Sequence, residues 1–205
     1  MKRRCFEIVI RFILAGLFLV SGFFGIFYKN YFVAFTSLVA LFLILFSFKF
    51  TDEKGVQISS FISAVFLGFI FLSLFLGEIN AFYARFWWWD LLLHSMAGFM
   101  LGLMGFSLVY YMNKSSRNVT LNPYFISFFG FGFAITLSVF WEFFEFSVDY
   151  FFGTNMLKSG LMDTMGDLIV AAMGAFVVSL IGYLGLKHYY KIAVRFFDNL
   201  LLRND

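Results

Sequence analysis

Charged residues are scarce in this sequence: Asp, Glu, Lys and Arg make up only 13% of its 205 residues, whereas 62% are hydrophobic. A water-soluble domain carries about twice that charged share. Proline occurs once, so long helices are rarely interrupted by it. The apolar residues fall in runs of about twenty, the length at which an α-helix crosses a bilayer. We therefore predict an all-α, polytopic transmembrane helix bundle with no separate soluble domain.

Cysteine and histidine are almost as rare, and this excludes several classes of site. Cys5 is the single cysteine, so neither a disulfide framework nor a thiolate metal site is available within the chain. His94 and His188 are the two histidines, too few for the His-rich sites of membrane desaturases. We find no Ser-His-Asp arrangement, and the Gly130–Gly132 pair lies in an apolar run without the strand that a phosphate-binding loop requires.

The apolar runs predict six membrane spans and short connections. The expected spans are 8–28, 31–50, 58–77, 89–112, 124–147 and 163–186. We treat 1–205 as one integral membrane domain. Its first three spans, over 8–77, form an apolar scaffold, and the last three, over 89–186, contain the polar residues. The short cytoplasmic tail, 187–205, is expected to form an interfacial amphipathic helix.

The basic residues predict the orientation of these spans. Placing the N-terminus in the cytoplasm puts twelve of the fifteen Lys and Arg residues on the cytoplasmic side and leaves only Lys29, Arg85 and Lys158 outside. Cytoplasmic loops of membrane proteins are enriched in Lys and Arg, so both termini are expected in the cytoplasm. The excess positive charge reflects topology, and no nucleic-acid partner is predicted.

The middles of the first three spans contain no ionisable residue, whereas the last three spans contain several. They are Asp90, His94, Glu142, Glu145, Asp163 and Asp167, with Asp149 just beyond the fifth span. An acidic residue at the centre of a membrane helix costs about 2.5–3.5 kcal/mol. Such residues therefore usually face a cavity and act there.

Helical spacing and topology bring these residues together. Three pairs are separated by three or four positions and so share a helix face: Asp90 with His94, Glu142 with Glu145, and Asp163 with Asp167. Small residues such as Gly98, Ala134 and Ala171 continue each face and let membrane helices approach closely. Because successive spans alternate in direction, all three pairs are expected at the level of the outer leaflet.

The composition of this cluster favours a divalent metal. So many carboxyl groups in a low-dielectric pocket cannot all be charged, so some are protonated or a cation neutralises them. Carboxylates suit Mg²⁺, Mn²⁺ or Ca²⁺, and one imidazole also admits Zn²⁺ or Fe²⁺. The candidate ligands are His94, Glu142, Glu145, Asp163 and Asp167, and the candidate catalytic residues among them are His94, Glu142 and Glu145.

Four further residues are assigned to the surroundings of the cluster. Asp90 is expected to orient His94 from the second coordination shell. Arg85, Lys158 and Asp149 are placed at the rim, where the two basic residues either pair with the acids or bind an anionic head group. Simpler roles stay open: Asp90 and Asp163 could be helix N-caps, and Asp149 could lie among lipid head groups.

Four segments carry a family resemblance. They are Trp89-Asp90-x-Leu92-x-His94-x-x-x-Gly98, Trp141-Glu142-x-x-Glu145, Phe152-Gly153-Thr154-Asn155 and Asp163-x-x-x-Asp167. Together they resemble the YjdF-like predicted inner-membrane proteins and, more distantly, the VanZ-like proteins, over about 85–180. The resemblance implies a prokaryotic cytoplasmic membrane and supports the same cluster, but it implies no established reaction. The chain has Gly160 where the family typically has Asp.

We therefore expect a metal-dependent membrane hydrolase or transferase that acts on a lipid or lipid-linked substrate at the outer leaflet, with the segment 148–162 as a lid. One alternative is an ion- or proton-coupled permease. Another is a non-catalytic protein that binds a lipid head group or a partner. The sequence leaves the substrate, the metal and the oligomeric state open.

Overall fold

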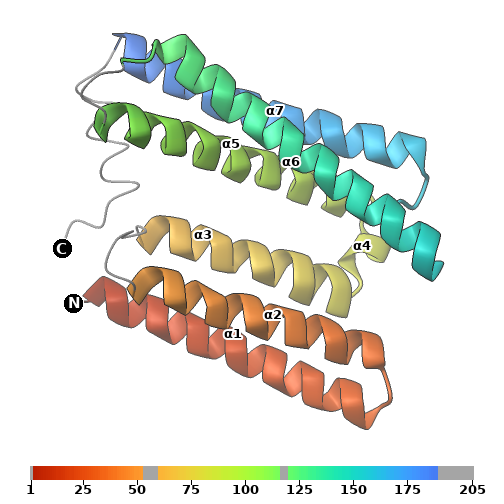
Figure 1. Cartoon of the computed structure of the whole chain (residues 1–205). Helices are drawn as coiled ribbons and strands as arrows, with labels where there is room; N and C mark the ends of the chain where they lie inside the picture. The colour runs from red at the N-terminus through yellow and green to blue at the C-terminus, as the bar shows by residue number, and fades with distance from the viewer. Residues whose placement is uncertain (1, 53–59, 116–119, 189–205) are drawn as a thin grey trace. The chain divides into compact units, whose positions relative to one another are not determined.

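The described part of the computed structural model, residues 2–52, 60–115 and 120–188, contains helices and no strands (Figure 1). The elements are α1 (Lys2–Phe27), α2 (Tyr31–Asp52), α3 (Ser60–Ile70), η1 (Phe71–Ile79), α4 (Phe82–Arg85), α5 (Trp89–Ser115), α6 (Pro123–Phe152) and α7 (Leu161–His188). The all-α prediction is confirmed for these residues. The tail predicted over 187–205 lies outside them, except for the two residues that end α7.

Four helices are long and apolar enough to cross a membrane. They are Ile8–Phe27, Trp89–Lys114, Pro123–Phe152 and Leu161–His188, and the shorter apolar helices are Tyr31–Phe46 and Ser63–Ile79. Large apolar side chains such as those of Phe140 and Phe143 lie exposed on α6, as expected for a helix that faces lipid. The chain is thus a membrane protein with at least four candidate spans among the described residues.

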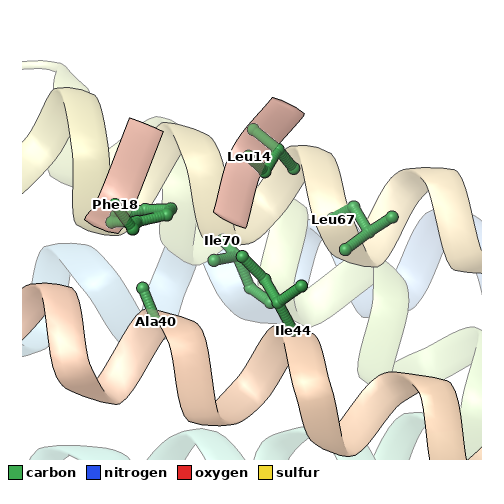
Figure 2. Close-up of a cluster of buried hydrophobic side chains, with 6 residues drawn as sticks. All are labelled: Leu14, Phe18, Ala40, Ile44, Leu67 and Ile70. Atoms are coloured by element: carbon green, nitrogen blue, oxygen red, sulfur yellow. The ribbon is translucent and has the colours of Figure 1, made fainter. Parts of the chain in front are cut away.

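The chain folds into two compact units, which divide between Trp89 and Asp90. The first unit contains α1 to α4, and its core joins side chains from α1, α2 and α3 (Figure 2). Phe18, Ala40 and Ile44 are fully buried there. Arg11, near the start of α1, is also buried and donates a hydrogen bond of 2.7 Å to the Ser63 hydroxyl on α3.

The sequence did not predict the change of helix type within the third apolar segment. After Ile70 the backbone widens into a π-helix, η1, and the N–H of Asn80 still bonds to the carbonyl of Phe75 five residues earlier. Gly77 lies on this segment, where an added Cβ would come within 2.4 Å of the Tyr83 ring. Wide turns of this kind are rare and usually short.

The second unit consists of α5, α6 and α7, and small residues bring α5 and α7 into backbone contact. A Cβ added to Gly98 would lie 2.0 Å from the Ala171 carbonyl oxygen, and one added to Gly174 would lie 2.2 Å from that of Ser95. Gly130 of α6 packs in the same way against the backbone of Phe106. The predicted stripe of small residues is therefore a packing surface, as is common between membrane helices.

The boundaries of α6 and α7 correct the expected connection between them. The Asn122 side chain caps α6 by accepting from the Tyr124 N–H at 2.9 Å, with Pro123 in the first turn. The helix continues to Phe152 and ends at Gly153, which has a left-handed φ of 65°. The loop therefore spans 153–160 instead of 148–162, and Asp149 lies in the last turn of α6.

Candidate metal centre

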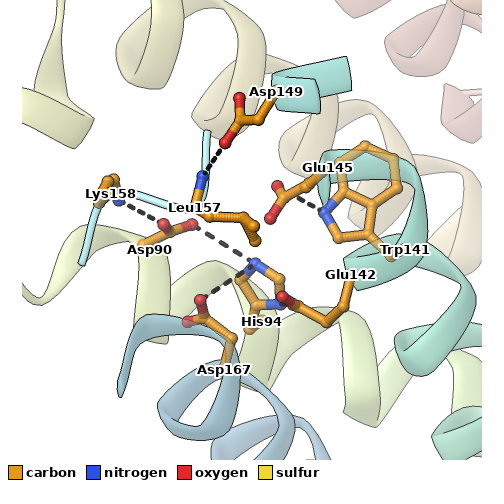
Figure 3. Close-up of polar contacts among 9 residues, drawn as sticks. All are labelled: Asp90, His94, Trp141, Glu142, Glu145, Asp149, Leu157, Lys158 and Asp167. Carbon is orange, nitrogen blue, oxygen red and sulfur yellow. Dashed lines mark hydrogen bonds and ion pairs between the residues drawn. The ribbon is translucent and has the colours of Figure 1, made fainter. Parts of the chain in front are cut away.

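The polar residues of the second unit meet at one end of its three helices (Figure 3). Asp90 and His94 come from the first two turns of α5, and Asp167 from the second turn of α7. Glu142 and Glu145 come from the C-terminal half of α6. Because α6 runs antiparallel to α5 and α7, its end lies beside their beginnings (Figure 1).

His94 is the centre of this cluster, and its two ring nitrogens face different acids. Nε2 lies 3.5 Å from Asp90 Oδ1 and 4.0 Å from Asp167 Oδ2, whereas Nδ1 lies 3.8 Å from Glu142 Oε1. A neutral imidazole carries a proton on one nitrogen and a lone pair on the other. The arrangement therefore allows one ring nitrogen to donate its proton in a hydrogen bond to an acid while the other nitrogen binds a metal ion.

Three of the carboxyl groups are almost completely removed from solvent. The exposed fractions are 4% for Glu142, 8% for Glu145 and 1% for Asp167. Both oxygens of Glu142 and Oδ1 of Asp167 are buried without a hydrogen-bond partner among the described residues. The Thr164 hydroxyl approaches Glu142 without reaching normal hydrogen-bond geometry. Buried polar groups normally have partners, because leaving one unsatisfied costs about 1–3 kcal/mol.

Two groups of three side chains are compact enough to hold a metal ion. One consists of Asp90, His94 and Asp167, and the other of His94, Glu142 and Glu145. In each group the potential ligand atoms lie within 4.8 Å of one another. His94 belongs to both groups, so the structure brings three of the four predicted carboxylate ligands, together with Asp90, around its imidazole.

Asp163, the fifth predicted ligand, belongs to neither group. It lies half-buried in the first turn of α7, one turn before Asp167. Neither Asp163 nor Asp90 is an N-cap, because both are inside the first turn of their helices. The capping role considered for them is therefore wrong.

Glu145 has a hydrogen-bond partner that the sequence analysis did not assign. Trp141 Nε1 donates to Glu145 Oε1 at 2.9 Å, one turn away on α6 (Figure 3). Trp141 entered the sequence analysis only as part of the Trp141-Glu142-x-x-Glu145 segment. The spacing of four residues was the available signal, since it places both side chains on one helix face.

Asp149 organises the loop between α6 and α7. Its Oδ1 accepts hydrogen bonds from the Thr154 hydroxyl at 2.5 Å and from the Met156 N–H at 2.7 Å, and its Oδ2 accepts one from the Leu157 N–H at 2.9 Å. The carboxylate is thus turned toward the loop backbone, where it supports local structure.

Of the two basic residues predicted at the rim, Lys158 reaches the cluster. Its ammonium group donates to Asp90 Oδ2, across 68 residues of sequence. Of the two roles considered for Lys158, pairing with an acid or binding an anionic head group, the structure shows the first. Arg85 lies at the end of α4 in the first unit, so its rim position stays a prediction.

The family of the chain follows from its sequence as a whole. The model of a family described as "Predicted membrane protein (DUF2238)" matches residues 8–188. The chain belongs to this family. No curated protein and no solved structure matches it. The match extends over both units, whereas the resemblance found in the sequence covered mainly the second, and the family description names no reaction.

Proposed function

We propose that this DUF2238 protein binds a divalent cation in the His94 cluster and uses it to act on a lipid or lipid-linked substrate. The observation that carries the proposal is the pair of buried carboxyl groups, Glu142 and Asp167, that contain oxygens without hydrogen-bond partners beside an imidazole. A cation would bind the Glu142 oxygens, neutralise the adjacent Asp167 and so offset the cost of burying both charges. Acidic residues in compact groups are common without a metal, but such burial without partners is not.

The contacts of His94 favour one of the two ligand groups as the primary one. Asp90 lies nearest to Nε2 and is suited to accept its proton, an arrangement typical of metal-binding histidines. The lone pair then lies on Nδ1, which faces Glu142. We therefore assign His94, Glu142 and Glu145 as primary ligands, with Asp167 adjacent and Asp90 as the partner that orients the ring. Asp163 stays a predicted ligand.

The chemistry of such a site fits hydrolysis or group transfer. A bound divalent cation polarises a carbonyl or phosphoryl oxygen and lowers the pKa of a bound water. His94, Glu142 and Glu145 would touch the cation and the reacting atoms, which makes them the candidate catalytic residues. Trp141 would hold Glu145 in place, and the 153–160 loop reaches the cluster through the contact of Lys158 with Asp90.

The proposed substrate follows from the location of the site. The cluster lies at one end of three helices that can each cross a membrane, where a lipid head group would be accessible. We retain six spans, cytoplasmic termini and an outer-leaflet site in a prokaryotic cell membrane as parts of this proposal. They rest on the distribution of Lys and Arg.

Cation binding can be measured with Mn²⁺ as a paramagnetic probe. Full-length protein purified in detergent is titrated with Mn²⁺, and the free ion is quantified by electron paramagnetic resonance. We expect one site, weakened at least about tenfold by Glu142→Gln or Asp167→Asn. Glu78→Gln, a charge-matched change outside both ligand groups, should leave it unchanged. Folded protein that binds no Mn²⁺ and contains no other divalent metal as purified would refute the proposal.

One observation favours the permease alternative. Ser107 of α5, Ser127 of α6 and Ser179 of α7 are buried, and their hydroxyl oxygens have no hydrogen-bond partner among the described residues. Such groups often bind buried water, which could extend the polar cluster along the unit. Cation flux into proteoliposomes that is abolished both by Glu142→Gln and by alanine at the three serines would select the permease.

A further inference from the structure

Lys158 places a positive charge at the edge of the proposed cation site. Its ammonium group is paired with Asp90, a member of one of the two ligand groups and the nearest acid to His94 Nε2. The lysine side chain is 34% exposed and that of Asp90 only 14%. The pair therefore lies where the buried cluster meets the loop.

The loop that carries Lys158 is held in place from both sides. Asp149 binds the backbone N–H groups of Met156 and Leu157, the two residues immediately before Lys158. On the other side, the N–H of Gly160 bonds to the carbonyl of Leu157 at 2.6 Å. The position of the ammonium group therefore depends on Asp149, which belongs to neither ligand group.

The backbone of Lys158 supports the same conclusion. Its φ is +40°, in the left-handed region that residues other than glycine rarely adopt. Such a conformation costs about 1 kcal/mol or more and persists when surrounding contacts impose it. Here those contacts are the hydrogen bonds that Asp149 accepts from the N–H groups of Met156 and Leu157, and the ion pair between the Lys158 side chain and Asp90.

We propose that Lys158 is an internal competitor of the divalent cation and sets the affinity of the site. The inference rests on the proposed function. An ammonium group bound to Asp90 neutralises part of the cluster, and it repels a divalent ion bound around His94. Cation binding must therefore displace Lys158 or overcome its repulsion, and both lower the affinity. The 153–160 loop, which Asp149 fixes, holds the Lys158 ammonium group at Asp90.

The first test removes the charge. Mn²⁺ affinity is measured by electron paramagnetic resonance for the wild type, Lys158→Gln, Lys158→Arg and Lys29→Gln. Lys29 is a matched control, because it also lies in a loop at positive φ, +56°. We expect Lys158→Gln to bind Mn²⁺ at least about tenfold more tightly, from the repulsion between neighbouring charges at the effective dielectric constant of a protein surface. Lys158→Arg and Lys29→Gln should remain near the wild type.

The second test detaches the loop and leaves the lysine in place. Asp149→Ala removes the anchor of Met156 and Leu157, so Lys158 should lose its position at Asp90 and Mn²⁺ should again bind more tightly. A purely electrostatic effect has the opposite sign, because removing a negative charge weakens cation binding. If the alanine variant does not fold, as judged by its helical circular dichroism, Asp149→Asn loosens the loop in part, because its amide nitrogen cannot accept the Leu157 N–H.

The outcomes separate this inference from the proposed function. Wild-type protein that binds no Mn²⁺ overturns the proposed function. Wild-type protein that binds Mn²⁺, with an affinity that neither Lys158→Gln nor the Asp149 variant increases, overturns the role of Lys158 alone. If Lys158→Gln binds Mn²⁺ more tightly but the Asp149 variant binds it more weakly, the loop anchored by Asp149 does not position the Lys158 charge.

Discussion

Trp141 Nε1 donates a hydrogen bond of 2.9 Å to Glu145 Oε1, one helical turn away on α6. The indole thereby fixes the carboxyl group of a primary ligand in the proposed site, although Trp141 itself is half exposed and belongs to neither ligand group. Carboxylates that bind metals are commonly held by such hydrogen bonds. The relationship leads directly to a prediction.

We predict that Trp141→Phe weakens Mn²⁺ binding by about tenfold, since loss of an outer-shell partner typically costs 10–100-fold in metal affinity. The helix should persist, because phenylalanine preserves the aromatic surface. Trp88→Phe, an exposed tryptophan of the first unit, is the control. Equal Mn²⁺ affinities in both variants and the wild type would show that the indole does not position Glu145.

The close contact between α5 and α7 predicts a steric effect on both fold and site. Gly98→Ala should destabilise the protein by about 1–3 kcal/mol, because the new Cβ would overlap the Ala171 carbonyl. It should also weaken Mn²⁺ binding, since His94 and Asp167 lie one turn away on the same two helices. Thermal unfolding in detergent, followed by circular dichroism, measures the first effect.

Gly132→Ala is the matched control for this substitution. Among the described residues, no heavy atom beyond the adjoining backbone of α6 lies within 4 Å of a Cβ added at Gly132, and alanine is the better helix former. We expect the melting temperature of this variant to stay the same or rise slightly. A comparable loss of stability in both variants would contradict the packing role of Gly98.

The two aspartates of α7 should differ in their effects. Asp167 is 1% exposed and belongs to a ligand group, whereas Asp163 is half-buried and belongs to neither. Asp163→Asn should therefore reduce Mn²⁺ affinity by less than Asp167→Asn does. A larger effect at Asp163 would favour the original set of five ligands, with α7 shifted toward the cation.

The orientation can be tested in intact cells. In a background with Cys5→Ser, a cysteine at exposed Ser159 in the α6–α7 loop should react with a membrane-impermeant maleimide added outside. A cysteine at exposed Thr120, before α6, should react only after the cells are opened. The reverse labelling pattern would place the cluster at the cytoplasmic face and invert the predicted topology.

Much of this architecture could be predicted from the sequence, because membrane helices follow local rules. Apolar length located the long apolar helices among the described residues, and the spacing of Asp90 and His94 placed both on one face of α5. The predicted helix ends were less accurate: α6 continues to Phe152 because Gly153, with its left-handed φ, supplies the stop. The π-helical turns of η1 have no comparable signal in the sequence.

The contacts within the site were harder to predict for a physical reason. Whether Asp149 faces the cluster or the loop depends on loop backbone groups whose positions no periodic pattern determines. The same is true of Lys158. Its sequence position allows it either to pair with an acid or to bind a head group, and only the loop geometry places it at Asp90. Helix faces can be predicted from spacing, whereas loop-borne partners require the structure.

The central claim is that a divalent cation binds between α5 and α6 at His94. The most direct measurement is a crystal structure of the full chain grown with Mn²⁺, with anomalous diffraction data collected at an energy where manganese scatters anomalously. The account predicts an anomalous peak at bonding distance from His94 Nδ1 and from carboxylate oxygens of Glu142 and Glu145. A well-ordered cluster without such a peak, or a peak away from His94, would contradict it.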